Sequence, residues 1–169
     1  MNSSELKSLQ EPIKEKYRKD PASAIITLRA EGKLGDGISC KVETGRAMVE
    51  AGLHPATGGT GMLACSGDML LEALVACAGV TLSAVSTAIG VNIINGFVKA
   101  EGDLDFKGTL GVSKEVSVGF KTIRLVFDLE TDATAEQMAS LSKLTERYCV
   151  VYQTLMKGVS VETKYQLKS

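Results

Sequence analysis

The stretch MLLEALVACAGVTLSAVSTAI, residues 69–89, decides the fold of this chain. Glu72 is its only charged residue, and small residues are interspersed among its larger aliphatic residues. A membrane span needs about 20 predominantly apolar residues and usually has basic residues at one flank. This stretch is rich in Ala, Ser, Thr and Gly, and no basic cluster flanks it on either side. We therefore expect a helix buried on most sides by its own protein, and no membrane partner.

Capping residues set the limits of this helix and of two others. Ser66 is expected to cap the start of the apolar helix, and Gly90 to end it. Residues 3–18 carry apolar side chains three or four positions apart, which predicts an amphipathic helix as an N-terminal extension within residues 1–20. Thr134 is expected to cap a third helix that continues to Gly158.

The predicted strands come in runs rather than alternating singly with helices. Three precede the glycine-rich loop at 52–61, two follow the apolar helix with a loop at 108–113 between them, and one ends the chain: 24–30, 38–43, 46–50, 91–106, 117–129 and 159–167. This order predicts the α+β class, with antiparallel sheets packed on the long central helix. The length and the lack of a linker predict a single domain over residues 1–169.

Composition excludes several classes of function. The 19 basic and 20 acidic side chains leave a net charge of -1, so no nucleic-acid partner is expected. The glycine-rich stretch Gly58–Gly61 lacks the lysine of a phosphate-binding loop. A single histidine and four widely spaced cysteines offer no local ligand pair, so we expect no metal. The polar N-terminus and the few cysteines favour a reducing, cytoplasmic location.

Two cysteines have settings that suggest thiol chemistry. Cys77 lies inside the apolar helix, and Cys149 lies in the helical segment TERYCVVYQTL, residues 145–155. On two helices they could face each other as attacking and resolving thiols, if their Cα atoms came within about 5.5 Å. A free cysteine is more often an inert, buried side chain. The residues alone leave both interpretations open.

The segments MLLEALVAC (69–77) and ERYCVVYQTL (146–155), together with the glycine-rich loop, resemble the OsmC/Ohr family. These are the osmotically inducible and organic hydroperoxide resistance proteins. The resemblance runs from about residue 29 to residue 167. It implies an α+β fold built as an intertwined homodimer, with active sites at the subunit interface and no cofactor.

The resemblance also implies a role for each cysteine. Cys77 matches the peroxidatic cysteine and Cys149 the resolving one. In this reaction the Cys77 thiolate attacks an organic hydroperoxide and becomes a sulfenic acid, which condenses with Cys149. A lipoyl-type dithiol then reopens the disulfide by exchange. The alternative is an OsmC-like protein that binds a small apolar or electrophilic ligand without peroxidase turnover.

The chain departs from the family pattern at two places. The family typically has Pro-Glu before the cysteine helix, where this chain has Ser66–Gly67, and commonly has proline after the second cysteine, where this chain has Val150. The family's Glu helps to hold a catalytic arginine over the thiolate, so these departures indicate a divergent branch.

Activation of Cys77 therefore needs its own explanation. Burial in an apolar helix should raise the pKa of Cys77, which is wrong for a nucleophile. We expect a cation near Cys77 to oppose this effect. Arg46 is the first candidate and is assigned to substrate binding, and Arg147 and Arg29 are the next candidates for the cation. The two other cysteines, Cys40 and Cys65, match no family cysteine.

Overall fold

The computed structural model describes residues 2–19, 31–34, 39–43 and 48–167 of the chain. The predicted strand at 24–30 lies outside these residues. The helices are α1 (Ser3–Lys19), η2 (Pro55–Thr57, a 3-10 turn), α2 (Ser66–Ile89), α3 (Phe106–Thr109), α4 (Ala135–Tyr148) and α5 (Val150–Lys157). The strands are β1 (Glu31–Leu34), β2 (Ser39–Glu43), β3 (Met48–Gly52), β4 (Ala64–Cys65), β5 (Ile93–Asp103) and β6 (Thr122–Thr131).

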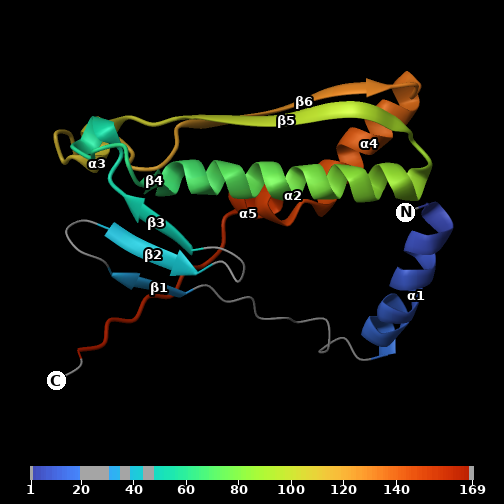
Figure 1. Ribbon diagram of the computed structural model, residues 1–169, viewed down its shortest axis with the longest axis horizontal. Coiled ribbons are helices and arrows are strands. Elements are labelled where there is room, and N and C mark those ends of the chain that lie inside the picture. Colours follow the sequence, from blue (N-terminus) through green and yellow to red (C-terminus); the bar gives the residue numbers. More distant parts are fainter. Residues whose placement is uncertain (1, 20–30, 35–38, 44–47, 168–169) are drawn as a thin grey trace.

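Helix α2 is the central element of the fold. Strand β5 packs along one side of it, α4 and α5 pack against another, and α1 and β4 also contact it (Figure 1). The first sheet has the order β1-β2-β3-β4, in which β4 is parallel to β3 and the other pairs are antiparallel. The second sheet is the antiparallel pair β5–β6. The predicted α+β class, with antiparallel sheet on a long central helix, is confirmed.

The start of α2 differs from the prediction by one residue. Cys65 occupies the N-cap position because it is still extended and paired with Gly52 in the first sheet. No side chain caps the helix, so the prediction that Ser66 is the N-cap is wrong. The end of α2 is as predicted. Gly90 adopts φ 72°, a left-handed conformation that glycine reaches without strain, and its N–H donates to the Ser86 carbonyl.

Only one stripe of α2 is buried within the single chain. Leu74, Ala78, Leu82 and Val85 lie three or four residues apart and face the other elements. The helix is 24 residues long with a mean hydropathy of 1.8 in its apolar window, of which 28% is buried. By length and composition such a helix could cross a membrane, but core helices of soluble proteins have the same properties. Burial on most sides is therefore not achieved by one chain.

The long β5–β6 ribbon covers α2 with one apolar face. Side chains of β6 alternate between half-buried and exposed, as expected when one face of a strand is packed. The outer face carries ion pairs, including Lys99 with Asp128. Strand β5 is shorter than the predicted 91–106, because Val91 packs in the core and Phe106 begins α3. Strand β6 begins at Thr122 and ends at Thr131, later at both ends than the predicted 117–129.

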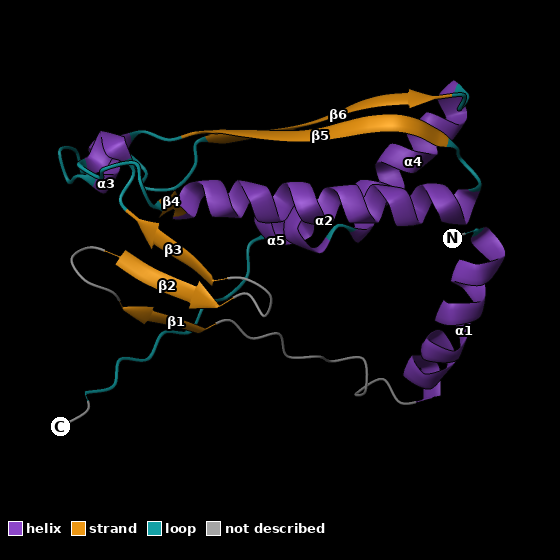
Figure 2. Cartoon of the chain, in the orientation of Figure 1, coloured by secondary structure: helices purple, strands orange, loops and turns teal. Residues whose placement is uncertain are grey.

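In the C-terminal third, the predicted start of a helix is confirmed, whereas the predicted single helix and the predicted last strand are wrong. Thr134 caps α4 in a reciprocal pair with Gln137, as the sequence indicated. The single helix expected to run to Gly158 is instead two helices that meet at Cys149. The predicted strand at 159–167 is an exposed segment that forms no strand with any described residue and is drawn as a loop in Figure 2. Tyr165 in this segment is 95% exposed.

Candidate redox site

The site begins with the junction between α4 and α5. Cys149 ends one helix and starts the next: its N–H donates to the Thr145 carbonyl over 3.0 Å, and its carbonyl accepts from the N–H of Gln153 over 2.9 Å. Its backbone is extended, at φ -71° and ψ 108°. The side-chain amide of Gln153 also donates to the Glu146 carbonyl over 2.8 Å and joins the two helices. The change of direction at Cys149 is therefore held from both sides.

A buried stripe on α4 directs Cys149 toward α2. Leu141, Thr145 and Cys149 are spaced four residues apart, so they lie on one helix face. All three are buried, Cys149 being only 1% exposed. This face packs on α2, and α5 packs on α2 as well. The junction between the two helices is thus placed beside the central helix.

The structure brings the Cys77 and Cys149 side chains into contact. Cys77 projects from α2 and is half-buried. The N–H groups of Val150 and Val151, the thiol of Cys149 and the hydroxyl of Thr81 lie near its sulfur and lower the pKa of Cys77. Thr81 lies one turn further along α2. The two cysteines that the sequence singled out are therefore neighbours.

The neighbours of Cys77 favour its thiolate. Burial raises the pKa of Cys77 and is the largest single effect. The N–H of Val151, the thiol of Cys149, the N–H of Val150 and the Thr81 hydroxyl together lower the pKa by more than burial raises it. The net pKa of Cys77 lies below the ordinary value of a thiol. Burial raises the pKa of Cys77 as expected, but among the described residues uncharged donors rather than a cation oppose that effect.

The pKa of Cys149 moves in the opposite direction. Burial raises it most, and donation of the Cys149 proton to Cys77, together with the negative charge there, raises it further. The N–H groups of Tyr152 and Val151 lower it in part. The pair therefore ionises unequally: Cys77 is the sulfur that loses its proton first, and Cys149 is the protonated donor.

The expected cation is not among the groups that act on Cys77 in the described part of the chain. The groups that lower its pKa are uncharged N–H, S–H and O–H donors. Arg46 and Arg29 lie outside the described residues. Arg147 is exposed, and its guanidinium lies over the Tyr148 ring, 5.5 Å from the ring centre. Thr81 and the two valine N–H groups were not identified from the sequence.

Two further cysteines lie elsewhere. Cys65 is half-buried before α2, twelve positions from Cys77, which is roughly 18 Å along a helix. Cys40 lies in β2, opposite Ala51 of β3. Among the described residues, no group of three or more His, Cys, Asp and Glu side chains is placed to hold a metal ion.

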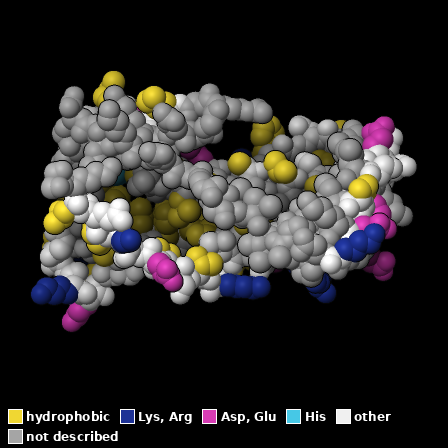
Figure 3. Space-filling model, turned by 90° about the horizontal axis from the view of Figure 1, so that it is seen from below, with side chains coloured by type: hydrophobic (Ala, Val, Ile, Leu, Met, Phe, Trp, Pro, Cys, Tyr) yellow, Lys and Arg dark blue, Asp and Glu magenta, His cyan; other side chains and the backbone are white. Residues whose placement is uncertain are grey.

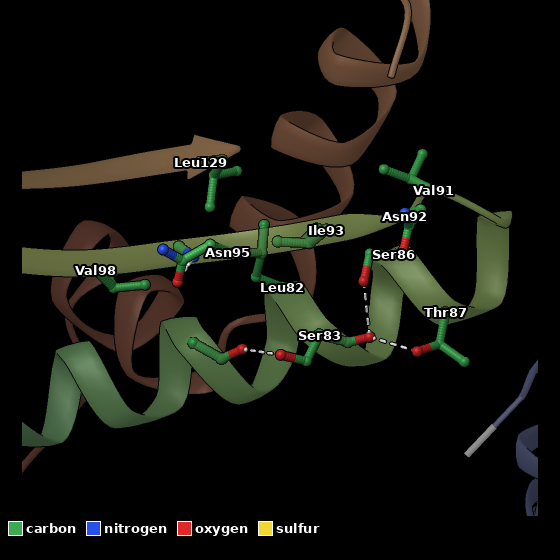
Figure 4. A pocket seen from close by; sticks show the side chains of 12 residues that line it. Leu82, Ser83, Ser86, Thr87, Val91, Asn92, Ile93, Asn95, Val98 and Leu129 are labelled. Carbon is green, nitrogen blue, oxygen red and sulfur yellow. Dashed lines mark hydrogen bonds between the residues drawn. The ribbon is translucent and has the colours of Figure 1, made fainter. Parts of the chain in front are cut away.

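A cavity of about 550 Å³ between α2 and β5 is separate from the cysteine pair (Figure 4). Ser83, Ser86 and Thr87 line it, and their hydroxyls donate to α2 carbonyls over 2.8–3.0 Å. No charged or thiol side chain is among its lining residues. The cavity lining offers no charged or thiol group that could activate these hydroxyls as nucleophiles, so we place the chemistry at the cysteine pair.

Comparison with known proteins decides the family. A profile of the family described as OsmC-like protein matches residues 59–164, more than half of the chain. The chain belongs to the OsmC-like protein family. This match includes both Cys77 and Cys149. No curated protein matches this OsmC-like chain in sequence.

Solved structures share the fold. The OsmC-like protein from Mycoplasma pneumoniae is 16% identical, with a TM-score of 0.65 over 79% of this chain and 89% of that one. An organic hydroperoxide resistance protein from Elizabethkingia anophelis is 17% identical, with a TM-score of 0.62 over 79% and 90%. The organic hydroperoxide resistance protein OhrB of Bacillus subtilis is 18% identical, with a TM-score of 0.52 over 81% and 96%.

Replacing Thr81 tests the contribution of its hydroxyl to Cys77. Thr81→Val keeps the shape of the side chain but removes the donor, so the pKa of Cys77 should rise. We expect alkylation of Cys77 by iodoacetamide at pH 7 to slow by about threefold, because a smaller thiolate fraction is partly offset by higher nucleophilicity. Thr81→Ser keeps the hydroxyl and is the matched control. Equal rates in the two variants would show that the hydroxyl has no role.

Proposed function

We propose that this protein is a thiol-dependent peroxidase that reduces organic hydroperoxides through Cys77 and Cys149. The observation that carries the proposal is the contact between the Cys77 sulfur, with its lowered pKa, and the protonated thiol of Cys149. Membership of the OsmC-like family supports it, as do the solved structures of organic hydroperoxide resistance proteins with this fold. We place the reaction in the reducing cytoplasm.

The first step uses the two sulfurs in different ways. The Cys77 thiolate attacks the terminal oxygen of the hydroperoxide, the O–O bond breaks, and the sulfur gains a hydroxyl group. The remaining alkoxide takes up a proton and leaves as the alcohol. Cys77 is oxidised by two electrons to a sulfenic acid, and the hydroperoxide is reduced by two electrons. Only the sulfur that ionises first can carry out this attack efficiently.

The second step follows from the loss of charge at Cys77. In the sulfenic acid the negative charge that raised the pKa of Cys149 is gone, so its proton is released more easily. The Cys149 sulfur then attacks the Cys77 sulfur, and water leaves as the disulfide forms. A dithiol of the lipoyl type reopens the disulfide by exchange and is itself oxidised to a disulfide.

We further propose that the protein works as a homodimer. Two adjoining hollows, of about 540 and 450 Å³, lie beside β6, the first against α4 and α5 and the second against α2 and α5, and share the side chains of Ile123, Leu125, Tyr152 and Met156. The central helix is covered on one stripe only, and its Val80 is 72% exposed. Figure 3 shows hydrophobic side chains exposed in a hollow of the surface. A second copy would bury these apolar surfaces symmetrically.

The dimer is tested by mass in solution. We expect light scattering at micromolar concentration to give twice the chain mass. Leu125→Glu places a charge in the apolar hollow and should shift the protein toward monomer. Val126→Glu, on the exposed face of the same strand, is the matched control and should leave the mass unchanged. A monomeric wild-type protein would contradict the proposal.

The peroxidase is tested by the unequal roles of its cysteines. Adding one equivalent of cumene hydroperoxide to the reduced protein should give a Cys77–Cys149 disulfide, seen by peptide mass spectrometry. Cys77→Ser should consume no peroxide, because the attacking sulfur is gone. Cys149→Ser should consume about one equivalent and leave Cys77 as a sulfenic acid that dimedone traps.

Cys65→Ser provides the matched control for this experiment. We expect it to behave as the wild-type protein, because Cys65 lies far from the pair along α2. If Cys65→Ser rather than Cys77→Ser abolished the first turnover, the assignment of the nucleophile would be wrong. If the wild-type protein consumed no peroxide at all, the ligand-binding alternative would replace the peroxidase.

A further inference from the structure

The side chain of Thr145 carries a buried hydroxyl group without a hydrogen-bond partner. Thr145 is 2% exposed, and among the described residues its Oγ1 is the one buried side-chain oxygen or nitrogen that makes no hydrogen bond. The hydroxyls of helical serines and threonines can bond back to a carbonyl three or four positions earlier. Those of Ser83 and Thr87 in α2 do so, over 3.0 and 2.8 Å. The Thr145 hydroxyl does not, although a buried polar group left unpaired lowers stability.

This hydroxyl lies one helical turn before Cys149, on the same face of α4. The N–H of Cys149 donates to the Thr145 carbonyl over 3.0 Å, which keeps the turn between the two residues helical. Side chains in a helix lean toward its N-terminus, so the Cys149 side chain leans over the turn that carries Thr145. Cys149 is 1% exposed. Both groups are therefore shut off from bulk water, and each depends on protein atoms for its hydrogen bonds.

The charge state of Cys149 decides whether this hydroxyl has a good acceptor. A thiol sulfur accepts hydrogen bonds weakly, whereas a charged acceptor such as a thiolate accepts them strongly. In the reduced protein Cys149 is the protonated member of the pair, because burial and the neighbouring Cys77 raise its pKa. In the second step it must lose this proton at a buried position, where a negative charge without hydrogen bonds is costly. A hydroxyl donor one turn away reduces that cost.

We propose that the Thr145 hydroxyl donates a hydrogen bond to the Cys149 sulfur when that sulfur becomes a thiolate and attacks Cys77. Side chains four positions apart in a helix have Cβ atoms about 5–6 Å apart, so the hydroxyl needs only to rotate within its side chain. Thr81, which lowers the pKa of Cys77, is likewise four positions from its cysteine. The inference rests on the proposed function only in taking Cys149 as the sulfur that attacks Cys77.

The variant Thr145→Val separates this role from packing. Valine has nearly the shape of threonine without the hydroxyl, so it removes a buried polar group that has no partner. We expect Thr145→Val to unfold about 2–4 °C above the unaltered protein at the same concentration. A lower unfolding temperature would show that the hydroxyl already has a partner in the reduced protein, against the inference. Thr145→Ser keeps the hydroxyl and is the matched control.

The attack by Cys149 is measured without peroxide, so that the result does not depend on the proposed activity. In a protein with Cys40→Ser and Cys65→Ser, excess dithiobis(nitrobenzoate) converts Cys77 into a mixed disulfide and releases one nitrothiobenzoate ion. Cys149 then loses its proton and attacks the Cys77 sulfur, the protein disulfide forms, and a second nitrothiobenzoate ion leaves. Stopped-flow absorbance separates the two phases, because only the first depends on reagent concentration. Cys149→Ser should release one ion only, which identifies the second phase.

The second phase carries the test. We expect Thr145→Val to slow it about tenfold and to leave the first phase unchanged, because the first phase involves only Cys77. Thr145→Ser should keep the second phase close to that of the unaltered protein. Equal second phases in the valine and serine variants, or an equal slowing of both phases by valine, would overturn the inference. A protein that passes this test but consumes no peroxide would overturn only the proposed function.

A second measurement keeps Thr145 itself and covers the case in which the valine variant does not fold. In Cys77→Ser, Cys149 is the ionising thiol that remains of the pair. The methyl resonance of Thr145 should move as Cys149 loses its proton, because the hydroxyl turns toward the new charge. Adding Cys149→Ser to this variant should abolish the titration. A Thr145 methyl resonance that does not respond to pH in Cys77→Ser would overturn the inference.

Discussion

The pairing of Cys77 with Cys149 depends on one constraint: the chain leaves helical geometry at Cys149, between α4 and α5, which both pack on α2. Because α4 ends there, the buried stripe of Leu141, Thr145 and Cys149 stays against α2. Because α5 begins at the next residue, the N–H groups of Val150 and Val151 lie near Cys77 and lower its pKa. A continuous helix would satisfy those groups internally. The break thus brings together a nucleophile, a proton donor and an anion-stabilising backbone.

The site resolves a conflict between burial and ionisation. An apolar central helix packs well against β5, α4 and α5, but a sulfur held in such surroundings resists losing its proton. Hydrogen bonds from Val150, Val151, Cys149 and Thr81 reverse that effect at Cys77. At Cys149, burial and donation to Cys77 act in the same direction. The pKa of Cys77 is therefore lowered and that of Cys149 raised, although the two side chains are identical. An attacking and a resolving thiol require this difference.

The sequence predicted the features that depend on local patterns. The apolar run 69–89 predicted α2, Gly90 its end and Thr134 the start of α4. Resemblance singled out Cys77 and Cys149, which the structure places in contact. The break at Cys149 was missed, because no Gly or Pro marks it and apolar spacing continues through it. The N–H donors of α5 were missed with it, since backbone groups are the same at every residue. Thr81, four positions after Cys77, could have been found from helical spacing.

The order in which the two thiols ionise is the central claim, and it can be measured directly. With cysteine labelled by carbon-13 at Cβ, nuclear magnetic resonance follows each thiol separately through a pH titration of the reduced protein. The structure predicts that Cys77 titrates with a pKa below the ordinary thiol value and Cys149 with one above it. A Cys77 resonance that titrates at or above the ordinary value, or after that of Cys149, would contradict the account.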